Sequence, residues 1–210
     1  WDYVDLGLPA ETGALLMIQD DGPAACIEHA AATLAAVART PAALEVKVAA
    51  DAQEVALLWK ARKALSPALR NIAPKKINED VVVPVARMGE FIDGLERLSR
   101  EHAITIVNFG HAGNGNIHVN LLTHPDDAAE MERAAACLDA MFNLVLELGG
   151  TLSGEHGVGL EKREFVAREI DPVTLRLMQD IKRQFDPNNI LNPGKGLPEA
   201  APAPASDRGD

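Results

Sequence analysis

The segment Asn108–Asn120 constrains the fold more than any other part of the chain, because it predicts a β-hairpin with one polar face. Asn114-Gly115 is a strong signal for a two-residue turn, since both central positions of a type I′ turn need positive φ. A turn there places His111 opposite His118, with both side chains on one side of the sheet. Directly opposed Cβ atoms lie roughly 4.5–5.5 Å apart, so these two imidazoles could share one metal ion.

Two histidines on one strand face form part of a metal site, which a carboxylate would complete for zinc, manganese or ferrous iron. The best candidate carboxylate is Glu155, which lies in the glycine-rich segment Ser153–Gly159. Glycines allow a backbone to approach a ligand closely, so polar groups among them are normally exposed to something. The alternative is a hairpin with two stacked histidines beside a flexible loop. We expect a metal site made of His111, His118 and Glu155.

Four other polar residues are candidates for chemistry, each with a simpler alternative. Histidine is the usual general base near neutral pH, so His156 could serve as one, but it could equally be a further metal ligand or a structural histidine. Asn120 lies two residues beyond His118 on the same strand face and could bond a substrate oxygen, or simply face solvent. Arg62 and Lys76 could hold an anionic substrate, although each could also be an ordinary surface charge.

Composition and charge exclude several classes of protein. The net charge of −11 and the small number of aromatic residues argue against binding of nucleic acid, which requires clustered Lys and Arg. Cys26 and Cys137 lie far apart without metal or redox spacing, which favours a reduced, cytoplasmic environment. We expect no transmembrane segment, because no apolar run approaches 18 residues. The start at Trp1 instead of Met suggests a piece of a longer protein.

The hydrophobic pattern predicts an α+β fold, in which helices cover one face of an antiparallel sheet. The chain lacks the glycine-rich strand-to-helix turn of a dinucleotide-binding fold. Expected strands cover residues 14–19, 43–48, 80–85, 104–109 and 117–123. Expected helices cover residues 24–39, 51–69, 88–102, 162–168 and 172–185, with another from Pro125 to a stop at Gly149-Gly150. Residues 198–210 are rich in Ala and Pro and predict a disordered tail.

Five segments, in this order along the chain, resemble the C-terminal domain of FAD-linked oxidases of the vanillyl-alcohol oxidase superfamily. The nearest branch holds D-lactate dehydrogenase, D-2-hydroxyglutarate dehydrogenase and the D subunit of glycolate oxidase. The segments are Trp59–Arg62, Lys76–Pro84, Phe109–Asn120, Ser153–Arg163 and Phe185–Lys195. The resemblance implies that residues 1–197 form a substrate domain with a ferredoxin-like α+β core. It also implies that the FAD is held mainly by an N-terminal domain that would precede Trp1.

The resemblance further implies an FAD-dependent dehydrogenase or oxidase that converts a 2-hydroxy acid to the 2-oxo acid, with hydride transfer to the flavin. It implies that the chain is inactive alone, since most of the flavin site would be missing. The sequence does not name the metal, because zinc and manganese both suit two imidazoles and one carboxylate. The resemblance implies that His111, His118 and Glu155 bind the metal and that His156 abstracts the proton. It implies that Arg62 and Lys76 bind the substrate carboxylate, with further substrate contacts by Ser66 and Asn120. It also implies that Asn192 and Lys195 lie near the flavin.

Two features of the chain refine this resemblance. Asn114 stands where the family commonly has Asp, although Asn-Gly forms an equally good turn. The ether-lipid synthase branch has a histidine-rich loop where this chain has Gly154–Gly157, which places the chain with the dehydrogenases. Two other functions stay open: a free-standing metal- or anion-binding module without redox chemistry, and, less favoured, a metal-dependent hydrolase with His156 as its base. A homodimer is a possible assembly.

Overall fold

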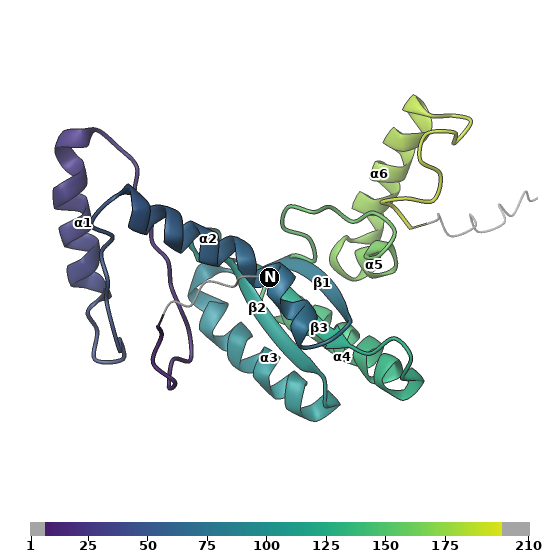
Figure 1. Cartoon of the computed structure of the whole chain (residues 1–210). Coiled ribbons are helices and arrows are strands. Elements are labelled where there is room, and N and C mark those ends of the chain that lie inside the picture. Colours follow the sequence, from purple (N-terminus) through teal and green to yellow (C-terminus); the bar gives the residue numbers. More distant parts are fainter. Residues whose placement is uncertain (1–6, 199–210) are drawn as a thin grey trace, which may run out of the picture. The chain divides into compact units, whose positions relative to one another are not determined.

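The computed structural model describes residues 7–198, and the chain divides into two compact units, Trp1–Leu69 and Arg70–Asp210 (Figure 1). The disordered tail expected over residues 198–210 lies, from residue 199 onward, outside the described residues. Over residues 7–198, no helix is both long enough and apolar enough to cross a membrane.

The first unit contains the helices α1 (Ala24–Ala38) and α2 (Ala52–Ala68). Asp51 caps α2, because its side chain accepts hydrogen bonds from the backbone N–H groups of Gln53 and Glu54 at 2.8 and 2.9 Å. Pro67 lies inside the last turn of α2, so the break that Ser66-Pro67 could have caused does not occur. Both helices therefore begin and end close to where local signals in the sequence predict.

The prediction of two strands in the first unit is wrong. Residues 14–19 and 43–48 are irregular and mostly exposed, and within residues 7–198 no strand precedes Lys75. A short apolar run becomes a strand only where a neighbouring strand satisfies its backbone hydrogen bonds. A side chain instead holds the first of these segments, since the Trp59 indole N–H donates to Gln19 Oε1 at 3.0 Å.

We expect the substitution Asp51→Ala to lower the free energy of unfolding of the first unit by about 1 kcal/mol, because two N-terminal amides of α2 lose their acceptor. Urea unfolding followed by circular dichroism measures this change. Asp20→Ala is the matched control, since Asp20 is an exposed aspartate in an irregular segment of the same unit. An equal effect of the two substitutions would contradict the capping role.

The second unit has the α+β fold that the sequence predicts. Its elements are β1 (Lys75–Val82), α3 (Met88–His102), β2 (Thr105–His111), β3 (Asn116–Thr123), α4 (Ala128–Glu147), α5 (Val166–Glu169) and α6 (Pro172–Phe185), with short 3-10 turns between some of them. The sheet is antiparallel in the order β1-β3-β2. Thr151 forms an isolated antiparallel bridge with Val82 on the outer edge of β1, at the position of the fourth strand of a ferredoxin-like sheet.

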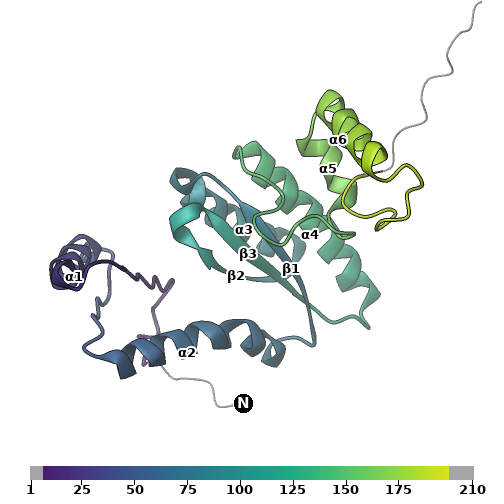
Figure 2. The same cartoon turned by 90° about the horizontal axis from the view of Figure 1, so that it is seen from above.

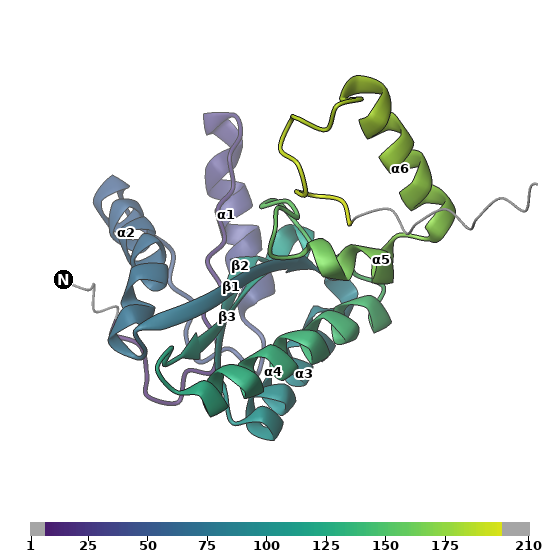
Figure 3. The same cartoon turned by 90° about the vertical axis from the view of Figure 1, so that its right-hand side faces the viewer.

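The core lies between one face of the sheet and the helices α3 and α4 (Figures 2 and 3). From the sheet, Val81, Val119 and Leu121 are fully buried, and they pack with Phe91 of α3 and Phe142 of α4. Because side chains alternate along a strand, the residues next to these in sequence point to the opposite face. That opposite face carries Lys76, Asn78 and Asp80 of β1, His111 of β2, and Asn116, His118 and Asn120 of β3.

The hairpin forms, but its register differs from the expected one. The turn contains a 3-10 segment, Ala112–Asn114, before Gly115 in the left-handed region at φ 76°. Phe109 therefore pairs with His118, so the expected opposition of His111 and His118 is wrong by two positions. A shift of two residues leaves every side chain on its expected face, because the side-chain period is two. The prediction that both histidines share one face is therefore confirmed.

Candidate metal centre

Three potential metal ligands from three different segments meet on the polar face of the sheet. His111 ends β2, His118 lies in the central strand β3, and Glu155 lies in the loop that follows Thr151. Glu155 Oε1 lies 3.3 Å from His118 Nε2 and 3.7 Å from His111 Nε2. One ligand atom from each residue lies within 4.8 Å of the other two. Ligands about 2.1 Å from one tetrahedral ion are roughly 3.4 Å apart, so this spacing fits a single divalent cation.

The environment of His118 favours the form of imidazole that binds a metal. The residue is only 7% exposed. Burial lowers the pKa of His118, and the positive charges that His156 and His111 can carry lower it further, while the Glu155 carboxylate opposes the shift. The neutral ring keeps a lone pair for a cation at Nε2. Its buried Nδ1 has no hydrogen-bond partner among the described residues. Two imidazoles and one carboxylate are a donor set that suits zinc or manganese.

His156 lies beside this cluster without belonging to it. Its ring stacks on that of His118, with the centroids 5.2 Å apart and the planes at 19°. The side chain is half exposed, and its Nδ1 lies 3.6 Å from Asp80 Oδ1. The set of mutually close ligand atoms contains His111, His118 and Glu155 but not His156. The ring is therefore accessible to a small molecule that also reaches the cluster.

The sequence did not single out Asp80 and Lys162, which hold the loop that carries Glu155 and His156. Asp80 is fully buried. Its Oδ2 accepts the backbone N–H groups of Glu155 and His156 at 2.5 and 2.9 Å, and its Oδ1 accepts Lys162 Nζ at 2.6 Å. Burial alone would raise the pKa of Asp80, but these three hydrogen bonds outweigh it and hold the pKa well below its usual range. The signal that could have identified Asp80 in the sequence is an acidic residue placed directly before the valines of β1.

We expect the stabilising effect of the Asp80 carboxylate to depend on pH. A carboxyl group whose pKa is lower in the folded state contributes stability above its unfolded pKa of about 3.9, and that contribution is lost as the pH falls through the folded value. Urea midpoints of the parent chain and of Asp80→Asn should therefore differ most near neutral pH and draw together as the pH falls below about 4 toward the lower folded-state pKa. A difference that stays constant into acid would contradict the charged state of Asp80.

The four residues expected to bind substrate lie in both units. Arg62 and Ser66 are half-buried on α2 in the first unit, four residues apart and thus on one helix face. Lys76 lies at the start of β1 in the second unit, on the polar face of the sheet. Burial, and secondarily the positive charge of Arg70, lowers the pKa of Lys76.

Asn120 lies on the polar face but is fully buried. Its Oδ1 accepts a hydrogen bond from Asn78 Nδ2 at 2.8 Å, and its own Nδ2 donates to the carbonyl of Val107 at 3.1 Å. Asn78 is the direct cross-strand partner of Asn120 and is less buried. The pair therefore presents Asn78 more openly than Asn120.

Asn192 and Lys195 lie in an exposed turn after α6. Asn192 has the left-handed φ of 48°, and Lys195 N–H donates to its carbonyl at 3.3 Å. The turn is joined to the glycine-rich loop, since the Gly196 N–H donates to the carbonyl of Gly159 at 2.8 Å. These two residues are thus attached to the segment that carries Glu155, although they do not belong to the cluster.

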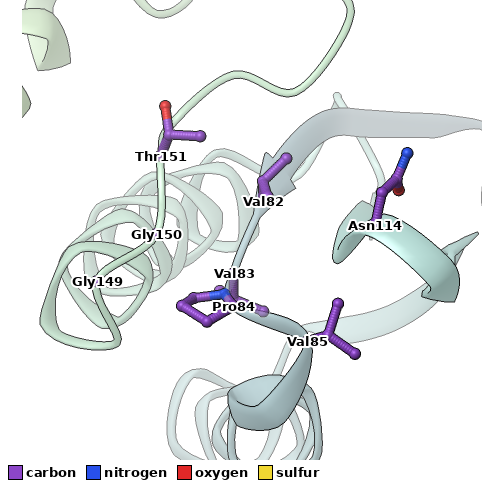
Figure 4. Close-up of a pocket in the computed structure, with 8 residues that line it drawn as sticks. All are labelled: Val82, Val83, Pro84, Val85, Asn114, Gly149, Gly150 and Thr151. Carbon is purple, nitrogen blue, oxygen red and sulfur yellow. The ribbon is translucent and has the colours of Figure 1, made fainter.

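A separate concavity lies where β1 ends, beside the turn of the hairpin (Figure 4). Its lining residues carry no ionisable side chain and are Val82, Val83, Pro84, Val85, Asn114, Gly149, Gly150 and Thr151. This lining therefore offers no titratable side chain for acid–base chemistry.

The fold and the cluster define a class: an α+β domain with helices on one face of its sheet and a candidate metal centre on the other. Within that class the chain belongs to a known family. Residues 2–196 match the family described as FAD linked oxidases, C-terminal domain. The match covers almost the whole chain, so the resemblance seen in the sequence is confirmed.

Relatives from several organisms agree with this family. The glycolate oxidase subunit GlcD of Bacillus subtilis is 35% identical over 194 residues, which are 92% of this chain and 41% of the relative. A D-lactate dehydrogenase of Archaeoglobus fulgidus is 35% identical over 77% of this chain and 35% of the relative. A D-2-hydroxyglutarate dehydrogenase of Stutzerimonas stutzeri is 35% identical over 68% of this chain and 31% of the relative. The chain thus spans less than half the length of these relatives.

Proposed function

We propose that residues 1–197 are the substrate- and metal-binding domain of an FAD-dependent dehydrogenase that oxidises a 2-hydroxy acid to the 2-oxo acid. The observation that carries the proposal is the convergence of two imidazoles and a carboxylate, with the ring of His156 stacked beside them at 5.2 Å. The names of the relatives support it, because glycolate, D-lactate and D-2-hydroxyglutarate are all 2-hydroxy carboxylates.

In this proposal His111, His118 and Glu155 hold a zinc or manganese ion. A cation bound there would polarise the 2-hydroxyl group of the substrate, lower its pKa and orient it. His156 accepts the hydroxyl proton, because its half-exposed ring borders the cluster without being part of it. The chain would thus bring the base and the hydroxyl group together in the orientation that the reaction needs.

The remaining assigned residues recognise the rest of the substrate and the cofactor. Arg62 and Lys76 pair with the substrate carboxylate, to which Arg is suited by its two-pronged geometry. Ser66 and Asn120 contribute polar contacts. Asn192 and Lys195 lie on the segment that approaches the FAD. In the complete flavoprotein, FAD held mainly by an N-terminal domain would supply the acceptor for the C2 hydride.

Anaerobic mixing of the complete flavoprotein with D-lactate, glycolate or D-2-hydroxyglutarate tests this function. We expect at least one of these acids to bleach the flavin absorbance, with L-lactate and the corresponding 2-oxo acid as controls. The chain alone should bind the metal but oxidise nothing. Metal binding without flavin reduction by any 2-hydroxy acid would instead support a free-standing binding module. Hydrolysis of an ester or phosphate by the chain alone would support a hydrolase.

A further inference from the structure

Asp80 and His118 are direct cross-strand partners on β1 and β3. Both side chains therefore point to the same face of the sheet, from positions roughly 5 Å apart. One member of this pair is a candidate metal ligand, whereas the other is a buried carboxylate outside the ligand set. Asp80 therefore lies next to a candidate metal ligand on the sheet and close to the loop that carries Glu155.

The loop is attached to Asp80 at both of its ends. At one end, two consecutive amides, those of Glu155 and His156, donate to Asp80 Oδ2. At the other end, Lys162 Nζ donates to Asp80 Oδ1 at 2.6 Å and to the backbone carbonyl of Asp80 at 2.7 Å. The segment between these ends contains Gly157 and Gly159, both at positive φ. Glycines add conformational freedom, so the attachment points determine where this loop lies.

The attachment is buried and charged. Lys162 is 4% exposed, and its Nζ also lies 3.5 Å from Glu79 Oε2. A buried ion pair with further hydrogen bonds has a narrow range of good geometries, and loss of one partner leaves an uncompensated charge. The loop also fits closely against β3, since a Cβ on Gly154 would lie 1.8 Å from Asn116 Nδ2. Little displacement of the loop is possible while these contacts persist.

We propose that Asp80, held by Lys162, is a positioning residue that sets the distance of Glu155 from the two imidazoles and the stacking of His156 on His118. The inference rests on the proposed function for its chemical meaning, but the attachment itself can be measured without metal, substrate or flavin. Residues that orient metal ligands typically change metal affinity by roughly 10–100-fold when they are replaced.

The first experiment is amide hydrogen exchange of the metal-free chain. We expect the Glu155 and His156 amides to exchange slowly in the parent, and roughly 10–100-fold faster in Asp80→Asn, because each loses a charged acceptor. Amides of β3 should stay protected in both. Asp139→Asn is the matched control, since Asp139 also pairs with a basic residue, Arg168 at 2.5 Å, but on the exposed surface. Fast exchange of both loop amides in the parent, or unchanged exchange in Asp80→Asn, would overturn the proposal.

The second variant covers the case in which Asp80→Asn does not fold. Gly154→Ala keeps Asp80 and Lys162 but places a Cβ 1.8 Å from Asn116 Nδ2 and 3.1 Å from Asp80 Oδ2, so the loop or the Asn116 side chain must shift. We expect the same loss of protection at Glu155 and His156, with the β3 amides unchanged. Retained protection of both amides, with the NMR signals of the Asn116 side chain unchanged, would show that their protection does not come from Asp80.

The third experiment separates positioning from general destabilisation by a double-mutant cycle on zinc and manganese affinity. Asp80→Asn should weaken binding by roughly 10–100-fold in the parent. It should change binding by less than about threefold in a Glu155→Gln background, because Asp80 acts through Glu155. Equal losses in both backgrounds would overturn the positioning role. A parent that binds neither metal would mean that another domain completes the centre or that the metal assignment of the proposed function is wrong, and hydrogen exchange would still decide whether Asp80 positions the loop.

Discussion

Replacement of His118 by Ala is expected to weaken the binding of zinc and manganese by more than about 100-fold, a larger loss than substitutions outside the ligand set cause. His118 lies in the central strand and is 7% exposed, so the sheet holds its backbone and ring in a fixed place beside the other two ligands. Its removal takes away one of the three mutually close ligand atoms found among residues 7–198. Equilibrium dialysis of the purified chain with each metal measures the change.

The matched control is His124→Ala. His124 is an exposed histidine that also lies next to a carboxylate, with Nδ1 3.1 Å from Glu130 Oε2, but outside the ligand set. It should bind metal as the parent does. Equal affinities of His118→Ala and the parent would refute the site. No binding by a well-folded parent would mean that another domain completes the centre, or that the histidines contact substrate directly.

Replacement of His156 by Ala is expected to slow flavin reduction in the complete flavoprotein by roughly 10²–10⁴-fold, the usual contribution of a general base. Metal affinity should stay within about threefold of the parent, because His156 stacks on a ligand but is not one. Stopped-flow bleaching of the flavin at saturating substrate, together with a metal titration, measures both quantities on the same protein.

His29→Ala is the control for this second substitution, since His29 lies on α1 in the first unit. It should leave both the reduction rate and the metal affinity unchanged. A large loss of metal affinity in His156→Ala would identify His156 as a further ligand, which was one of the alternatives left open by the sequence. An unchanged reduction rate would mean that a different group accepts the proton.

Local signals were reliable for the long helices, whereas the helix expected over residues 162–168 is a 3-10 turn, Arg163–Phe165, followed by the four-residue α5. The expected boundaries of α3 and α6 coincide with the observed ones, Met88–His102 and Pro172–Phe185. The start of α6 is encoded by Asp171, whose side chain caps the helix, and by Pro172 in its first turn. Such signals act within a few residues of each other, so they can be recognised without the tertiary structure.

Strands were predicted less well because their hydrogen bonds come from elsewhere in the chain. The apolar runs at 14–19 and 43–48 have the composition of strands, yet no neighbouring strand completes them in the described structure. The hairpin was recognised from Asn114-Gly115, but its register was not, since the 3-10 turn Ala112–Asn114 lengthens the connection. The prediction that both histidines share one face is still correct, because the register differs by an even number of residues.

The sequence by itself determined the family, the helices and the polar face of the hairpin, because these depend on motif order, local capping and the period-two alternation of strands. Only the tertiary structure decided that Glu155 reaches both imidazoles, and that Asp80 and Lys162 hold the loop that carries it. Asp80 and Lys162 are 82 residues apart, and nothing local links them. Folding brings them together because a buried carboxylate needs donors, and the sheet edge at β1 is where the loop can supply them.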